Sequence, residues 1–427
     1  MFLESMLTST TSMIDMHKST IWFVSIILLS CTFSGCFGED DKKEEKGFVW
    51  PEQVEKVCVI ANESGLVCDY YAELNSTPVL TLDDPDGSGI WLVSLDGLIT
   101  GWDTDADSEL PTQNNVVGDL SGIVSRCHYE QGLLGVEFDQ DYQNTSRLLL
   151  VYNENKTCET AKNSNIVLSH AKVVNGQIDL DTLEVLIEVN KSNRNHNGGN
   201  ILSVGNHNYV WSIGDGGGSF DPNDNGQNAS TMLGTIQMIK YQNESIVPVE
   251  GTDNLSYTLH YGLRNPWRID VDSNDNLWIA DVGQLCYEEV NVVSLMDSSN
   301  FGWADREGFH DIDPEKGCFE NRSAPNSDYT DPVIQYGHVD NHCSIIGGFW
   351  MDWGPEILQN GYLYGDFCSG QIWSAQYIDG NWTAVEVGNV GTMIVGFGKG
   401  GDGQLLIFSW AGAIYQLNEN HSSEDLP

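Results

Sequence analysis

The sequence is short of positive charge. Its 427 residues include 19 lysines and arginines against 62 aspartates and glutamates, which gives a formal net charge of −43. Because a field of that sign repels the phosphate backbone of DNA and RNA, we expect no nucleic-acid partner. The same field suits divalent cations and neutral ligands, and it is also typical of adaptation to a salty medium.

No apolar run reaches the roughly 20 residues that a membrane-spanning helix needs. The run near the N-terminus, Ile21–Leu29, follows a short basic start and fits the apolar region of an export signal. Small residues then precede Cys36, an arrangement that resembles a prokaryotic lipoprotein signal in which Cys36 becomes the lipidated first residue. An ordinary signal peptide and an uncleaved anchor are the alternatives.

The chain divides into an export region and one large domain. We expect an N-terminal extension and signal over 1–36, a charged tether over 37–50, the folded domain over 51–420 and a short tail over 421–427. The tether contains GEDDKKEEKG, which has no apolar residue to bury. The domain would therefore be secreted or periplasmic, or held at the cell surface, with contact to the membrane only through a lipid anchor at Cys36.

The sequence lacks any C-x-x-C pair, which argues against a zinc ribbon or a thioredoxin-type site. Of its 10 cysteines, eight follow the export region, and an even number outside the cytoplasm indicates disulfides. The sequence alone cannot choose among the possible connectivities. Pairing of nearest neighbours would join Cys58 to Cys68, Cys127 to Cys158, Cys286 to Cys318, and Cys343 to Cys368.

Helical periodicity is almost absent after residue 50. Short apolar runs alternate with Gly, Asn and Asp turns, the pattern of strands and hairpins. One unit of polar turn and strand recurs at 86–103, 133–153, 205–218, 273–284, 358–376 and 401–417. This spacing lies near the roughly 40–50 residues of a propeller blade. We therefore predict an all-β fold, a six-bladed β-propeller whose loops converge on one face, with a β-sandwich as the alternative.

The motifs of several enzyme classes are missing. There is no G-x-S-x-G elbow, and GDGGGS lacks the lysine of a phosphate-binding loop. DTDADSE, 103–109, lacks the glycine and the flanking helices of an EF-hand. Four polar, glycine-rich stretches remain as candidates for a site, at 128–138, 195–228, 261–271 and 281–291.

Three side chains in these stretches suit proton transfer. His196, in NHNGGN, is a candidate base because histidine takes a proton near neutral pH, or it forms a hydrogen bond in a turn. Asp215 would hold the imidazole tautomer, or it forms an Asp-Gly turn. Arg264 would stabilise a developing oxyanion, or it forms a structural salt bridge.

A cation site is the other candidate. Gly283, Gln284, Glu288 and Glu289 offer the carbonyl and carboxylate oxygens that Ca²⁺ prefers. A polar β-turn is the alternative interpretation of this stretch.

The motifs, taken in order, resemble the glucose/sorbosone dehydrogenase family, which includes soluble quinoprotein sugar dehydrogenases and hedgehog-interacting-protein-like propellers. They are EQGLLGVEFDQDY, NHNGGNI, IGDGGGSFDPNDNGQN, GLRNPWRIDVD, LWIADVGQ with EEVN, NFGWADREG, CSIIGGFW and YLYGDFCSGQIW. The resemblance runs from about Pro78 to Leu417 and implies a six-bladed propeller.

The resemblance also implies a reaction. An aldose would be oxidised at its anomeric carbon to a lactone, with pyrroloquinoline quinone (PQQ) as hydride acceptor beside Ca²⁺, and an external acceptor would take the electrons. His196 matches the base and Asp215 its support. Arg264 and Asn265 match the pair beside the quinone oxygens, and Gln131 matches a substrate-side or cofactor-side glutamine.

The same resemblance assigns the metal ligands. Gly283 and Gln284 match the positions whose carbonyls hold Ca²⁺, with Glu289 near a second acidic ligand position.

The chain departs from the quinoprotein pattern where a lysine and an Arg-x-Arg would anchor the three carboxylates of the quinone. Cys368 and Ser369 lie near the lysine position, and Lys399 is the only cation near the other. Two hypotheses follow. The first is an exported sugar dehydrogenase, and the second is a non-catalytic, surface-tethered propeller that binds glycan or protein through the channel face.

Overall fold

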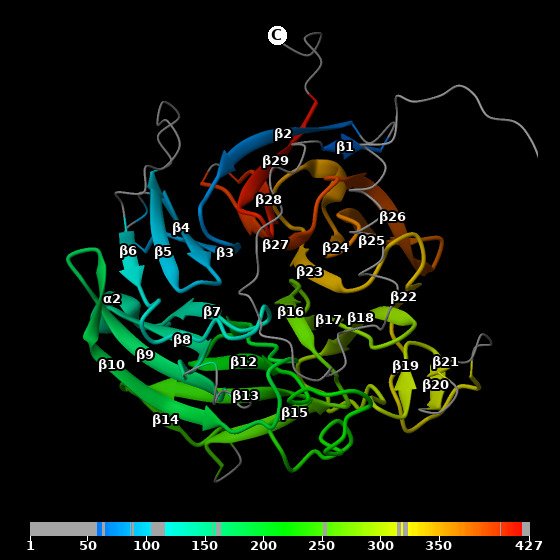
Figure 1. Cartoon of the computed structure of the whole chain (residues 1–427), viewed down its shortest axis with the longest axis horizontal. Coiled ribbons are helices and arrows are strands. Elements are labelled where there is room, and N and C mark those ends of the chain that lie inside the picture. Colours follow the sequence, from blue (N-terminus) through cyan, green and yellow to red (C-terminus); the bar gives the residue numbers. More distant parts are fainter. Residues whose placement is uncertain are drawn as a thin grey trace, which may run out of the picture. The chain divides into compact units, whose positions relative to one another are not determined.

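Six antiparallel sheets lie side by side around a central axis (Figure 1). The computed structural model describes residues 58–61, 65–85, 87, 89–103, 116–156, 158, 164–250, 254–313, 317–318, 323–401 and 403–420, all within the unit Lys43–Pro427. The other unit, Met1–Lys42, lies outside the described residues. The expectations for the export signal, the lipid anchor at Cys36, the tether and the tail therefore lie outside them as well.

The first three blades follow the chain order. Blade 1 consists of β3 (Pro78–Asp83), β4 (Gly89–Ser94), β5 (Leu98–Asp103) and β6 (Val116–Asp119). Blade 2 consists of β7 (Leu133–Phe138), β8 (Arg147–Asn153), β9 (Ile166–Val174) and β10 (Gln177–Val189). Blade 3 consists of β11 (Ile201–Ser203), β12 (Asn208–Ile213), β13 (Thr235–Gln242) and β15 (Ser256–Tyr261), and β14 (Ser245–Val247) also pairs with β13.

The remaining blades continue around the ring. Blade 4 consists of β16 (Pro266–Val271), β17 (Asn276–Asp281), β18 (Tyr287–Ser294) and β22 (Ile334–Gly337). Between its last two strands the chain forms a small sheet of β19 (Arg306–Glu307), β20 (His310–Asp313) and β21 (Gly317–Cys318). Blade 5 consists of β23 (Ile345–Trp350), β24 (Gly361–Asp366), β25 (Gln371–Ile378), β26 (Asn381–Asn389) and β1 (Val59–Ile60). Blade 6 consists of β27 (Ile394–Lys399), β28 (Leu405–Ser409), β29 (Ala413–Glu419) and β2 (Leu66–Glu73).

The fold confirms the prediction of a six-bladed, all-β propeller, and the β-sandwich alternative is wrong. Each of the six recurring sequence segments lies in a different blade. Helix in the described part of the chain is confined to α2 (Tyr142–Thr145) and η1 (Glu356–Leu358). None of the described helices is long and apolar enough to span a membrane.

Blade 6 closes the ring, because the N-terminal strand β2 pairs with the C-terminal strand β29. A disulfide between Cys58 and Cys68 ties β2 to the segment that carries β1. Three of the four nearest-neighbour pairings are thereby confirmed, since Cys127–Cys158 and Cys343–Cys368 also form. Cys286 is disulfide-bonded as well, and the side chain of Cys318 lies outside the described residues.

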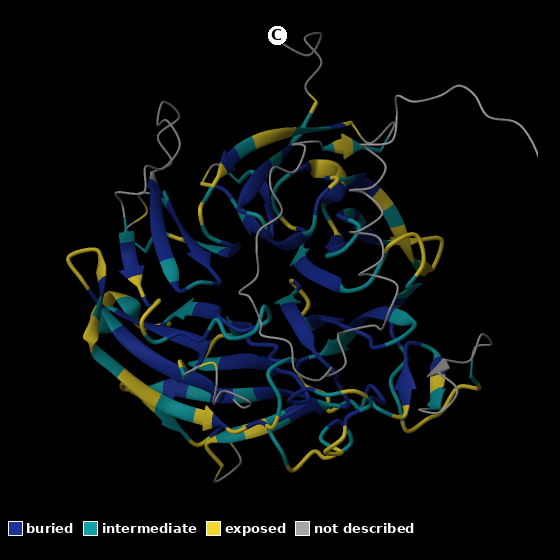
Figure 2. Cartoon of the chain, viewed as in Figure 1, coloured by how far each residue is buried: buried dark blue, intermediate teal, exposed yellow. Residues whose placement is uncertain are grey.

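The inner strands pack closely at the centre of the ring. Buried residues fill the sheets from the inner strands outward (Figure 2), and all seven residues of β8 are buried. The first strand of each blade contacts the first strands of the two neighbouring blades, all around the ring. A Cβ atom on Gly135 would lie 2.3 Å from the carbonyl oxygen of Gly199, and one on Gly396 would lie 2.4 Å from that of Val79. Glycine at these positions therefore permits the close approach of neighbouring blades.

Candidate active site on the channel face

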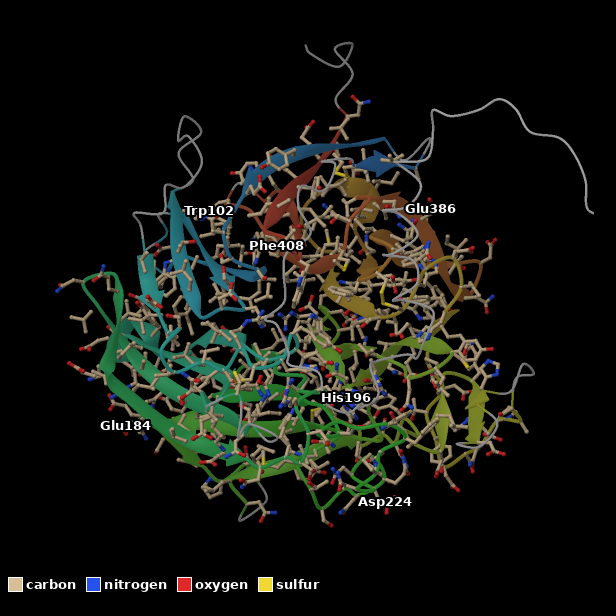
Figure 3. The ribbon with its side chains drawn as sticks, in the orientation of Figure 1. Trp102, Glu184, His196, Asp224, Glu386 and Phe408 are labelled. Atoms are coloured by element: carbon tan, nitrogen blue, oxygen red, sulfur yellow. A yellow bond between two sulfur atoms is a disulfide. The ribbon has the colours of Figure 1, made fainter. Side chains whose placement is uncertain are left out.

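The loops that enter the inner strands bring the predicted residues together. Gln131 precedes β7, His196 precedes β11, and Arg264 and Asn265 immediately precede β16. Asp215 follows β12 of blade 3. His196 lies closer to the centre of the ring than Glu184, Asp224 and Glu386, which lie near its edge (Figure 3). The propeller therefore gathers loops that are far apart in the sequence, as the four polar stretches predicted.

His196 and Asp215 form a hydrogen-bonded pair. The imidazole Nδ1 lies 2.6 Å from Asp215 Oδ1, and both residues are 0 % exposed. Because a carboxylate only accepts hydrogen bonds, the proton of the neutral imidazole lies on Nδ1, and Nε2 is then the basic nitrogen. The pair therefore has the tautomer that a general base requires.

Asp215 stays ionised although it is buried. Burial alone would raise the pKa of this carboxyl, but the neighbouring His196 and Arg264 hold it below its usual value. Its Oδ1 also accepts the N–H of Gly217 at 2.8 Å, and Oδ2 accepts the indole N–H of Trp303 at 2.8 Å. The carboxylate is thus fixed at both oxygens and presents a negative charge to the imidazole.

The loop around His196 has a conformation that depends on glycine. His196 itself has φ of +53°, and Gly199 has φ of +108°. A Cβ atom on Gly199 would lie 2.4 Å from the Cβ of Leu134. The N–H of Gly198 donates to Asn265 Oδ1 at 3.0 Å, which ties this loop to blade 4. The double glycine therefore lets the loop bend against blades 2 and 4 while it carries His196.

Asp281 positions the Arg264–Asn265 pair. Its Oδ2 accepts the backbone N–H of Arg264 at 2.9 Å, and its Oδ1 accepts that of Asn265 at 2.7 Å. The Arg264 side chain donates from Nη1 to the carbonyls of Val282 and Gly283, at 3.0 and 2.8 Å. The guanidinium carbon also lies 5.4 Å from the centroid of the Trp303 ring. Arg264 thus links the site to the loop between β17 and β18.

Gln131 supports the site from blade 2. It is 0 % exposed, and its Oε1 accepts the hydroxyl of Ser125 at 2.7 Å. Its Nε2 donates to the carbonyl of Arg194 at 3.3 Å, two residues before His196. In this arrangement Gln131 fixes the start of the His196 loop.

Several oxygens of the residues expected to hold Ca²⁺ accept hydrogen bonds. The Gly283 carbonyl accepts Arg264 Nη1, which places a cation where a metal ion would have to lie. Gln284 Oε1 accepts the N–H of Phe220 at 2.6 Å, and Glu289 Oε2 accepts that of Gly308 at 2.8 Å. Within the described ranges, no group of three or more His, Cys, Asp or Glu side chains is placed to hold a metal ion. The residues as arranged do not fit Ca²⁺.

Burial and like charge affect the acidic residues beside this loop. Asp281 and Glu289 face each other in the register of β17 and β18. Burial, and then the repulsion between the two carboxylates, raises the pKa of Glu289 above its usual value. The raised pKa favours the protonated form of Glu289 beside the Asp281 carboxyl.

The positions that would anchor the quinone carboxylates carry no available lysine or arginine. Cys368 is in a disulfide, and the Ser369 hydroxyl donates to Asp366 at 2.9 Å. Lys399 ends β27, and its ammonium lies 3.8 Å from Asp83, the last residue of β3. The site loops enter the first residues of the inner strands, so Lys399 lies at the opposite end of the channel. Its ammonium is therefore not placed to anchor a quinone carboxylate at the site.

Three cations near the site, Arg126, Arg264 and Lys191, already have partners. Arg126 Nε lies 3.0 Å from Asp96, and Arg264 binds two carbonyls. Lys191 Nζ donates to the Asn195 carbonyl at 2.8 Å. The residues as arranged therefore do not fit a cofactor with three carboxylates.

Sequence reasoning missed three residues that contact the His–Asp pair or its loop. They are Glu130, Lys191 and Trp303, and all lie close to predicted site residues. The signal from Lys191 was that it is one of 19 cations in the chain and precedes His196 by five positions. Glu130 and Trp303 lie in the motifs EQGLLGVEFDQDY and NFGWADREG, but neither motif indicates which of its residues contacts the His–Asp pair.

A six-bladed propeller with a buried histidine–aspartate pair among its channel-face loops is the class that the fold and the site define. The chain belongs to the glucose/sorbosone dehydrogenase family, whose model matches residues 96–390. The HIPL2 protein of Arabidopsis thaliana is 34 % identical over 206 residues, which cover 42 % of this chain and 29 % of HIPL2. The match thus spans less than a third of that relative.

Solved structures share the fold. The apo form of the soluble aldose sugar dehydrogenase of Escherichia coli has a TM-score of 0.63 at 15 % identity, covering 83 % of this chain and 99 % of that one. The PQQ-bound form of the aldose sugar dehydrogenase of Streptomyces coelicolor has a TM-score of 0.60 at 18 % identity, covering 84 % and 99 %. At these identities the likeness shows the fold alone.

Proposed function

We propose that the protein is an exported sugar dehydrogenase that oxidises an aldose at its anomeric carbon to a lactone, with His196 as general base. The observation that carries the proposal is the buried pair of His196 Nδ1 and Asp215 Oδ1 at 2.6 Å. Membership of the family, and the folds of the two aldose sugar dehydrogenases, support the same reaction class.

The residues of this chain supply the proton-transfer half of the oxidation. His196 Nε2 takes the proton of the anomeric hydroxyl, and Asp215 stabilises the imidazolium that results. Arg264, held beside the pair by Asp281, stabilises negative charge that develops on the sugar oxygen. Trp303 keeps the carboxylate oriented through its indole N–H.

The oxidation also removes a hydride from the anomeric carbon, and a redox acceptor must take it. The family resemblance implies PQQ with Ca²⁺, and an external acceptor would then receive the electrons. Because the described cations and oxygens, as arranged, do not fit PQQ and Ca²⁺, we assign no reaction step to PQQ. The experiment below therefore compares the reaction with and without these two groups.

Export is part of the proposal. Disulfides such as Cys58–Cys68, Cys127–Cys158 and Cys343–Cys368 are typical of proteins that fold outside the cytoplasm. A lipid anchor at Cys36 would hold the propeller at the cell surface, where an aldose and an electron acceptor are both accessible.

The test is aldose-dependent reduction of a dye by the purified full chain, with and without added PQQ and Ca²⁺. His196→Asn should abolish the reduction, because asparagine cannot act as a base. His207→Asn is the matched control, since His196 and His207 both have positive φ, which asparagine tolerates well. Oxidation that survives in His196→Asn would refute the assignment of the base.

A non-catalytic propeller that binds glycan or protein through the same face is the second candidate. This second candidate is favoured by the cations near the site, because Arg126, Lys191 and Arg264 already bind other groups and do not bind the carboxylates of a trianionic cofactor. Glycan binding that is equal in the wild type and His196→Asn, without oxidation by any acceptor, would establish this candidate instead.

A further inference from the structure

Lys191 is a buried cation that the proposed reaction does not use. It is 4 % exposed, and its ammonium donates to the carbonyl of Asn195 at 2.8 Å and to Asn197 Oδ1. These two asparagines flank His196. Asn197 Oδ1 also accepts the side-chain N–H of Asn153 from blade 2, at 2.8 Å. One ammonium group therefore fixes the backbone on one side of His196 and the side chain on the other.

The same ammonium faces both carboxylates that touch His196. Glu130 Oε2 accepts the backbone N–H of His196 at 2.6 Å, and Asp215 binds the imidazole. Burial lowers the pKa of Lys191 to about 7, and the charges of Glu130 and Asp215 oppose that decrease. The lysine is thus close enough to both carboxylates to interact electrostatically with each.

Other charged groups affect the His196–Asp215 pair through their interactions with Asp215. Arg264 lowers the pKa of Asp215, whereas Asp221 and Asp281 are carboxylates that repel it. Removal of Lys191 would shift the charge balance around the imidazole toward negative charge, because a cation that interacts with both Glu130 and Asp215 would be lost. Such a field stabilises the imidazolium, which cannot accept a proton.

We infer that Lys191 is a positioning residue for His196: its ammonium holds the loop through Asn195 and Asn197 and offsets the two carboxylates, so that the imidazole stays neutral and able to accept a proton. The consequence for catalysis rests on the proposed function. The effect of Lys191 on the ionisation of His196 does not depend on that function.

The test follows the ionisation of His196 by NMR in the full chain labelled at histidine, with the His196 signal assigned from its loss in His196→Asn. Lys191→Gln keeps an N–H donor and removes the charge, Lys191→Met removes both, and Lys191→Arg keeps both. Lys399→Met is the matched control, because it removes one cation from the other end of the channel.

The titration midpoint of His196 should rise by about one pH unit or more in Lys191→Gln and Lys191→Met. It should stay within a few tenths of a unit of the wild type in Lys191→Arg and Lys399→Met. If the chain oxidises aldoses, the acidic limb of kcat against pH should move upward by the same amount, and Lys191→Arg should restore it.

An unchanged midpoint in folded Lys191→Gln would overturn the inference. So would a Lys191→Gln chain that fails to fold while Lys191→Arg folds, since the lysine would then act in folding alone. A shifted midpoint in a protein that oxidises no aldose would keep the role of Lys191 and reject the proposed function, so the two failures are distinguishable.

Discussion

Asp215→Asn is the sharpest perturbation of the site, because it changes the hydrogen-bonding pattern while it keeps the shape of the side chain. Asp215 accepts three hydrogen bonds, from the His196 imidazole, the Gly217 N–H and the Trp303 indole. An asparagine has one acceptor oxygen and one NH₂ group, so it cannot accept all three bonds.

Both orientations of the asparagine are unfavourable. If its oxygen faces His196 and Gly217, its NH₂ group opposes the indole N–H of Trp303, donor against donor. If its NH₂ group faces His196 instead, the imidazole must carry its proton on Nε2, and the basic nitrogen is lost. A buried polar group left without a partner costs about 1–3 kcal/mol. Loss of a correctly oriented base lowers kcat by about 10²–10⁴-fold.

The assay has two parts. Denaturant unfolding measures the loss of stability, and aldose-dependent dye reduction measures the loss of rate. Asp221→Asn is the control, because Asp221 is also buried in the loop after β12 and its Oδ2 accepts the N–H of Gly226. Full activity in Asp215→Asn, or an equal loss of activity in both variants, would show that Asp215 does not hold the His196 imidazole in its basic tautomer.

Three further predictions concern stability. Burial raises the pKa of Asp270 to about 7, so between about pH 4 and pH 7 the folded chain holds a proton that the unfolded chain releases. The stability that this proton contributes is present at low pH and is lost as the pH rises from about 4 to about 7. Asp270→Asn should therefore flatten the dependence of the unfolding free energy on pH in that window, and a parallel dependence would contradict this. A Cβ atom on Gly283 would lie 1.8 Å from a backbone carbonyl oxygen, so Gly283→Ala should lower the melting temperature markedly, whereas Gly122→Ala, with open space around it, should not. Replacement of Cys58 and Cys68 by serine should lower the unfolding free energy by about 2–3 kcal/mol, because the bond closes a loop with a sequence separation of 10, and equal stability with and without a reductant would contradict that.

The sequence was sufficient for the architecture because every blade leaves a local signature. A polar turn followed by a strand occurs once in each of the six blades, and those signals need no knowledge of distant contacts. The shortest strands, such as β1 and β11, have too few residues to show a period. The ring closure by β2 was not predicted either, because it joins residues near opposite ends of the chain.

The candidate site was predictable only in part, for a similar reason. His196, Asp215, Arg264 and Asn265 lie in recognisable motifs, and the fold brings them into contact. Glu130 binds His196 from 66 positions away, a contact that no local pattern indicates.

Lys399 shows that nearness in the sequence does not imply nearness in space. It follows the residues that enter β27, but an extended strand gains about 3.3 Å per residue. Over the length of β27, Ile394–Lys399, the chain therefore crosses to the other end of the channel.

The most direct test of the account is lactone formation from an aldose in the presence of several acceptors, including PQQ with Ca²⁺ and an artificial dye, by the wild type and His196→Asn. The wild type should form lactone with at least one acceptor and His196→Asn should form none, although both should bind the sugar. Binding of the sugar by both proteins without lactone from either, whichever acceptor is supplied, would contradict the central claim that His196 is a catalytic base.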